Sequence, residues 1–278
     1  MPFSVSLFLL QWSIGSLGFL WLTTRHRIVG LGYGWITRIV FIFLAGLSIF
    51  LAEQQTDLFK LTALAVAIAS SISLIVSYMQ KDAGVSGQNK IAEERSKRVS
   101  EMTGIERSAK SKNSEIKEFN PSLDLLAPII GFVGLIVVGL MNESLLAVSR
   151  VLFGTLFLGA VTDAMLLGHW YLVQPGLKRD PLKELVYWTT GLWAPLTVLF
   201  LIPTGMFSVF SGTIDDGYVG LLGWFWAACV VTTLGLLIMT IIALKEKQYS
   251  AVMAATGLLY LAILTAFGID LVARALLI

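Results

Sequence analysis

Long apolar segments alternate with short polar connections along most of the chain. Most of these segments reach about 20 residues, the length that a helix needs to cross a bilayer core of about 30 Å. They are apolar on all faces, whereas the strands of a membrane barrel alternate apolar and polar residues, so a closed barrel is excluded. The pattern predicts an all-α, polytopic transmembrane helix bundle with eight spans, at residues 3–23, 29–52, 59–79, 123–141, 145–173, 183–210, 219–243 and 250–277.

Positive charge falls in every second connection. Of the 20 Lys and Arg residues, 16 lie in or next to the connections 24–28, 80–122, 174–182 and 244–249, and the other connections contain none. Basic loops face the cytoplasm in membrane proteins. We therefore expect both termini on the outer, extracytoplasmic side of a membrane of the bacterial cytoplasmic type.

Composition supports the membrane prediction. The chain is 56% apolar and 14% charged, whereas a soluble domain carries about a quarter charged residues. A net charge of +2 gives no reason to expect nucleic acid as a partner, so the main expected partner is the lipid bilayer. The single cysteine, Cys229, lies in an apolar segment and cannot form a disulfide or a cysteine metal site within one chain.

One polar insertion divides the chain. Residues 1–79 hold the first three predicted spans, residues 80–122 form a charged cytoplasmic segment, and residues 123–278 hold the other five. The insertion contains nine basic and seven acidic residues. The mixed charges between Lys90 and Lys117 predict a solvated helix between Gly87 and Asn120-Pro121, or partial disorder, and this segment could bind a cytoplasmic or membrane protein partner or anionic lipid headgroups.

Five ionisable residues, Arg38, Arg150, Asp163, His169 and Asp270, fall away from the ends of the predicted spans, and each is a candidate for function because an unpaired charge in hydrocarbon is costly. Depth estimates at about 1.5 Å per residue place Arg38 level with Asp163, and Arg150 level with Asp270. The sequence therefore predicts two ion pairs, Arg38–Asp163 and Arg150–Asp270. Such pairs either fix helix packing alone or also bind a proton, an ion or a polar headgroup.

The richest cluster of polar and aromatic residues is His169-Trp170-Tyr171, near the cytoplasmic end of the fifth span. Such a cluster could bond to a quinone carbonyl, ligate haem iron or relay protons, or it could simply anchor the helix end. The other histidine, His26, falls at the same boundary. Two histidines on one side could hold a single haem b, although a solvated role is commoner for a histidine between Arg25 and Arg27.

Motifs for soluble chemistry are missing. No phosphate-binding glycine loop, zinc-protease motif or hydrolase nucleophile elbow occurs, and no catalytic residue or metal site is predicted. Three hypotheses remain. The protein is a membrane redox or quinone-site protein, alone or as a subunit of a respiratory-type complex, or a transporter of a small solute or protons, or a scaffold that holds a partner through residues 80–122. In the first, the site consists of His169, Trp170, Tyr171, Arg38, Asp163 and His26.

Overall fold

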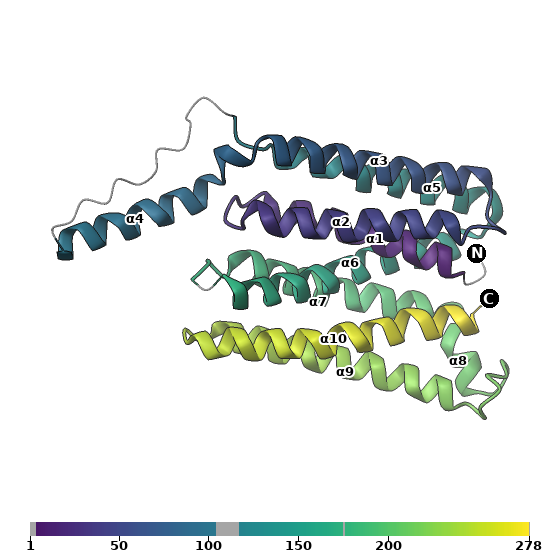
Figure 1. The fold of residues 1–278 in the computed structure, drawn as a ribbon. Coiled ribbons are helices and arrows are strands. Elements are labelled where there is room, and N and C mark those ends of the chain that lie inside the picture. The colour runs from purple at the N-terminus through teal and green to yellow at the C-terminus, as the bar shows by residue number, and fades with distance from the viewer. Residues whose placement is uncertain (1–3, 104–116, 175, 278) are drawn as a thin grey trace.

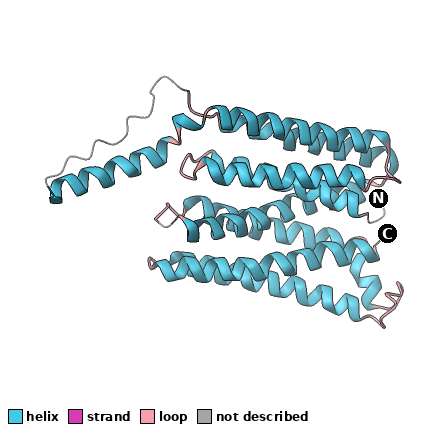
Figure 2. Cartoon of the chain, in the orientation of Figure 1, coloured by secondary structure: helices cyan, strands magenta, loops and turns pink. Residues whose placement is uncertain are grey.

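The computed structural model describes residues 4–103, 117–174 and 176–277. The described residues form helices and loops, with no strand among them (Figure 2). The helices are α1 (Val5–Thr24), α2 (Leu31–Phe50), α3 (Asp57–Met79), η1 (Lys81–Ala83), α4 (Ser86–Thr103), η2 (Pro121–Leu125), α5 (Leu126–Asn142), α6 (Leu145–Val173), α7 (Asp180–Leu201), α8 (Gly205–Phe210), α9 (Leu221–Lys245) and α10 (Tyr249–Leu276).

Local chemistry explains where several helices begin. Ser4, Thr56 and Ser144 cap α1, α3 and α6, and each hydroxyl accepts a hydrogen bond from a backbone N–H three residues later. These bonds satisfy amides that have no partner within the helix. Pro181 lies in the first turn of α7, where its missing N–H costs nothing. Polar connections therefore end the apolar segments at defined residues.

Seven helices are long and apolar enough to cross a membrane by length and composition: α1, α2, α3, η2 with α5, α6, α9 and α10. This agrees with a multi-pass integral membrane protein. Their bounds differ from the predicted spans by no more than three residues at either end. The predicted span 183–210 is different, because the chain forms α7 and the short α8 there, with a break at Pro203, and α7 is not among the seven apolar helices.

The long helices lie side by side in one bundle, and the start of α1 and the end of α10 are at the same end (Figure 1). α1 packs against α2 and α6, while α6 also packs against α7 and α10. These two helices form the centre, since 67% of the apolar window of α1 and 56% of that of α6 are buried, against 33% for α9. α4 extends away from the opposite end of the bundle (Figure 1).

Large apolar side chains are exposed on the outer helices. Examples are Phe43 at 66%, Leu264 at 65% and Val231 at 71%. A protein in water rarely exposes so many neighbouring apolar residues. Hydrocarbon chains are the solvent that suits such a surface, which agrees with the lengths of the helices.

Glycine allows α1 and α6 to cross closely. A Cβ atom on Gly15 would lie 1.9 Å from the carbonyl oxygen of Thr155, and a Cβ on Gly159 would lie 2.2 Å from the carbonyl carbon of Gly15. Small residues at such crossings let two helix backbones approach. The centre of the bundle therefore depends on this glycine pair.

Replacing Gly15 by alanine is expected to separate the two central helices and to lower stability by about 1–3 kcal/mol, because the new methyl group meets backbone. Unfolding in detergent micelles measures the loss. Gly235→Ala is the matched control, since nothing lies within 4 Å of that position, and its better helix propensity should leave stability equal or slightly higher. Equal stabilities of the two variants would contradict the role of the close crossing.

Asp216 closes the connection that precedes α9. Its carboxylate accepts hydrogen bonds from the backbone N–H groups of Tyr218, Gly220 and Leu222, at 2.8 to 2.9 Å. Although burial by itself would raise the pKa of Asp216, these backbone donors lower it below its ordinary value. The side chain thus fixes the turn and satisfies the first amides of the helix.

The pKa of Asp216 is lower in the folded loop than in an unfolded chain, so its contribution to stability is complete above about pH 3.9 and is lost as the pH falls through the lower, folded value. Hydrogen exchange of the amides of Tyr218, Gly220 and Leu222, corrected for intrinsic rates, should show this loss of protection. Asp216→Asn should expose these amides even at neutral pH. Asp215→Asn should not, because Asp215 accepts only from Gly217 N–H; equal behaviour of the two variants would refute the assignment.

Candidate functional site

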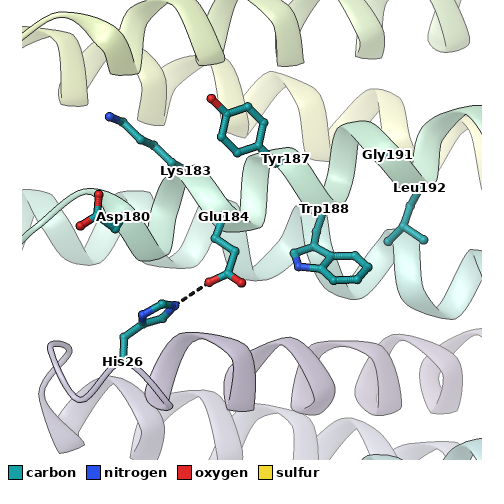
Figure 3. A pocket seen from close by; sticks show the side chains of 8 residues that line it. All are labelled: His26, Asp180, Lys183, Glu184, Tyr187, Trp188, Gly191 and Leu192. Carbon is teal, nitrogen blue, oxygen red and sulfur yellow. Dashed lines mark hydrogen bonds and ion pairs between the residues drawn. The ribbon is translucent and has the colours of Figure 1, made fainter.

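A groove along one side of α7 encloses about 690 Å³. Most of its lining comes from the first half of α7, and one residue comes from the loop between α1 and α2 (Figure 3). The groove opens at the surface of the bundle, at the end where the basic connections lie. Its lining residues are His26, Asp180, Lys183, Glu184, Tyr187, Trp188, Gly191 and Leu192.

Helical periodicity gathers these residues on one side of α7. Asp180, Glu184, Tyr187 and Gly191 follow one another at intervals of three or four residues, which places them along one stripe. Between them, side chains such as Leu185 point into the bundle core and are fully buried. Amphipathic spacing thus produces a helix with one face in the core and another face in the groove.

His26 and Glu184 form the polar end of the groove. His26 Nε2 lies 2.5 Å from Glu184 Oε2, and the guanidinium of Arg25 pairs with the other oxygen of the same carboxylate. Within the described part of the chain, Nδ1 of His26 has no hydrogen-bond partner. A carboxylate that holds one imidazole nitrogen orients the ring and leaves the other nitrogen for a ligand. The pair can therefore bind a polar group and accept or donate a proton.

Aromatic and apolar residues form the rest of the groove. Tyr187 and Trp188 are about half exposed, at 54% and 49%. The Trp188 ring packs edge-on against Phe19 of α1, with 6.2 Å between the centroids. At Gly191 nothing lies within 4 Å of where a side chain would begin. The groove thus offers a broad apolar surface that ends in a charged, hydrogen-bonding rim.

The charged insertion holds the loop that carries His26. Arg27 has a φ of 52°, in the left-handed region, and its side chain lies 2.8 Å from Glu118. Its carbonyl oxygen accepts a hydrogen bond from Gly87 N–H at the start of α4. Glu118 also accepts a bond from Ser86 N–H. Both ends of the insertion therefore meet at Arg27, next to the groove.

The three consecutive residues His169, Trp170 and Tyr171 have different environments. Nδ1 of His169 lies 3.1 Å from the hydroxyl of Tyr260 on α10. Trp170 donates to the side chain of Gln174 and packs beside α2, while the hydroxyl of Tyr171 donates to the carbonyl of Lys178. None of the cavities described here is lined by both histidines. The two imidazoles are thus engaged with different helices, His26 with α7 and His169 with α10.

The predicted Arg38–Asp163 ion pair is wrong. Arg38 binds Asp124 through two hydrogen bonds of 2.9 and 2.8 Å, and both side chains are 2% exposed. Phe119 covers the guanidinium at 5.0 Å, and the Thr24 hydroxyl donates to the same carboxylate. Arg38 pairs with Asp124 because η2 enters the bundle at the depth of Arg38. The sequence had placed Asp124 at the boundary of its predicted span.

The predicted Arg150–Asp270 ion pair is also wrong. Asp270 pairs with Arg274 one turn later on α10, at 2.8 Å, and Arg274 also contacts the side chain of Gln11. Arg150 instead donates to the carbonyls of Leu199 and Ile202, at 2.9 and 2.6 Å. A cation is well placed there, because the last carbonyls of α7 lack helical partners.

Glu184 and Glu118 are the site residues that the sequence did not reveal. Glu184 lies in the first turns of α7 and Glu118 lies just before η2. The sequence placed Glu184 at the start of the predicted span 183–210 and Glu118 in the charged segment 80–122, and neither was singled out. Only the folded chain brings them to the loop between α1 and α2, more than 90 residues away in the sequence for Glu118. The basic triplet around His26 could have indicated these acidic residues, because consecutive cations at one boundary require acidic partners or water.

No protein-family model, curated protein or solved structure matches the chain. Function must therefore be inferred from the residues of this chain, because an architecture of membrane helices is compatible with many activities.

Asp124→Asn would leave the Arg38 guanidinium buried without its counter-charge. Breaking one side of a buried pair costs about 3–5 kcal/mol, and we expect a loss of stability of that order in detergent unfolding. Asp82→Asn, at an exposed position of η1, should change stability by no more than about 0.5 kcal/mol. A loss in Asp124→Asn no larger than in this control would show that the pair does not hold α2 to η2.

Proposed function

We propose that the protein is a quinone-binding integral membrane protein whose site is the groove at His26 and Glu184. The observation that carries this proposal is the carboxylate-oriented imidazole at the polar end of an apolar, aromatic groove. A quinone has a planar ring with carbonyl oxygens and a long apolar tail. A polar rim next to a lipid-facing apolar surface suits both parts of such a molecule.

The proposed topology has eight crossings, with α7 as the crossing that is less apolar. Several facts support an even number. The start of α1 and the end of α10 lie at the same end of the bundle (Figure 1). The basic connections lie at the opposite end, which would face the cytoplasm of a bacterial-type membrane. The charged residues of α7, Asp180, Lys183 and Glu184, lower its hydropathy, and all three line the groove.

In this proposal His26 donates a hydrogen bond from Nδ1 to a quinone carbonyl while Glu184 holds Nε2. The same pair takes or supplies the proton that accompanies a change in the redox state of the ring. Tyr187 and Trp188 contact the ring faces and the first part of the tail. This replaces the predicted site around His169, Trp170 and Tyr171, whose polar groups bond separately to Tyr260, Gln174 and Lys178. A single haem b with two histidine ligands is not supported, because the two imidazoles do not share a described cavity.

A second candidate function is a scaffold, favoured by the position of α4. This helix extends from the bundle into the region beyond its basic end (Figure 1), and Met102 on it is 78% exposed. A cytoplasmic protein could bind along it. Under this alternative the groove binds bulk lipid alone and has no preference for a quinone.

A photoreactive quinone analogue in proteoliposomes tests the proposal. We expect label in the peptide that contains residues 180–192, displaced by unlabelled quinone. His26→Ala and Glu184→Gln should each lower labelling about tenfold, the effect of losing one charge-assisted hydrogen bond. His169→Ala is the matched control and should label like the parent. Label that unlabelled quinone does not displace, or that only His169→Ala removes, would overturn the proposal.

A further inference from the structure

Asp163 differs from the other carboxylates in the interior of the bundle. It lies on the central helix α6 and is 0% exposed. Asp124 and Asp270 are also buried, at 4% and 0%, and each is paired with an arginine. Neither oxygen of Asp163 has a hydrogen-bond partner among the residues that the structure describes. The quinone groove does not include this residue.

The helices around Asp163 do not supply a counter-charge. The described parts of α1 and α5 contain no Asp, Glu, Lys or Arg. From α10 the nearest charged pair lies beside Gly154, nine residues earlier on α6 and so roughly 13 Å away along the axis. The remaining ionisable groups of α2, α7 and α10 are engaged or line the groove: Arg38 with Asp124, Asp270 with Arg274, Glu184 with His26, and Asp180 and Lys183 at the rim.

A second unpartnered polar group lies near Asp163. The hydroxyl of Tyr33 on α2 is buried and has no hydrogen-bond partner in the described residues. The ring of Tyr33 packs edge-on against Trp170 of α6 at 5.8 Å, one residue before Tyr171 and two turns after Asp163 along that helix. The hydroxyl of Tyr171 in turn donates to Lys178 in the loop after α6. Polar groups therefore extend from Asp163 to the basic end of the bundle.

An isolated carboxylate in an apolar interior is far more costly than the neutral acid, and such groups bind a proton instead of remaining charged. A phenol hydroxyl both accepts and donates hydrogen bonds, so Tyr33 and Tyr171 suit the transfer of that proton. Tyr33 and Tyr171 lie on the side of Asp163 that faces the loop at residues 174–179.

We propose that Asp163 is an intramembrane proton-binding site, occupied by a proton at neutral pH and connected through Tyr33 and Tyr171 to the loop at residues 174–179. On loading, a proton from water at the loop ends on a carboxylate oxygen of Asp163, and on unloading it returns to water. No other bond changes. This site lies apart from the groove and does not depend on quinone binding.

Infrared spectroscopy of the protein in proteoliposomes tests the proposal. A protonated carboxylic acid has a carbonyl band separate from the carboxylate and amide bands. We expect this band at neutral pH, its loss in Asp163→Asn, its displacement in Asp163→Glu, and its retention in Asp270→Asn. A spectrum of the unmodified protein without the band at neutral pH, and with it only in acid, would overturn the assignment even if a variant failed to fold.

The route has its own measurement. Transfer to heavy water shifts the carbonyl band as the carboxyl proton exchanges, and the rate of this shift reports access. Tyr33→Phe, which keeps the ring and removes the hydroxyl, should slow the shift several-fold without removing the band. Tyr187→Phe is the control, because Tyr187 lies in the groove, and it should leave the rate unchanged. Equal rates in the two variants would refute the route through Tyr33.

Discussion

The structure depends on the requirement that a charged group surrounded by hydrocarbon be paired within the protein or neutralised by a proton. Helices satisfy their backbone groups internally, and side chains complete what the helices leave open. Arg38 and Asp124 satisfy each other in the interior, Asp216 satisfies the first amides of α9, and Arg150 satisfies carbonyls at the end of α7. Lipid-facing surfaces remain apolar because no such partners exist there.

This requirement also explains why the centre of the bundle and its edges are built differently. α1 and α6 cross through Gly15 and Gly159, with backbone against backbone, and polar side chains nearby bond to opposing carbonyls, as Gln11 does to Val151. In membranes, close packing and such hydrogen bonds hold helices together in place of a hydrophobic force. The outer helices α3, α5 and α9 carry large apolar residues on their lipid-facing sides.

Helix positions could be predicted from the sequence because length and hydropathy are local properties. The segment 145–173 was predicted with the bounds that the structure has, and the helix in the insertion was expected, although residues 104–116 of that prediction lie outside the described residues. Pairing of charges could not be predicted in the same way. Depth along a helix does not show which neighbouring helix a side chain faces. Arg38 and Asp270 pair with Asp124 and Arg274, which the depth estimates had not matched to them.

The candidate site was predicted in part. His26 and the basic boundary were identified from the sequence. Predicting the groove also requires knowing which face of α7 is turned toward His26, and residue spacing shows only which residues of α7 share a face. Asp163 was singled out because a charge inside a span is costly. In the structure Asp163 is buried, and its predicted partner Arg38 pairs with Asp124 instead. An unpaired group is thus more informative than a paired one.

The loop between α1 and α2 joins two parts of the molecule that are otherwise separate. Arg25 and His26 contact Glu184 in α7, while the next residue, Arg27, binds Glu118 and the first turn of α4. A protein that displaces the first turn of α4 on binding must therefore change the position of the imidazole beside the groove. Thermodynamic linkage makes this effect mutual, since a ligand that fixes His26 must change the affinity of α4 for such a protein by the same factor.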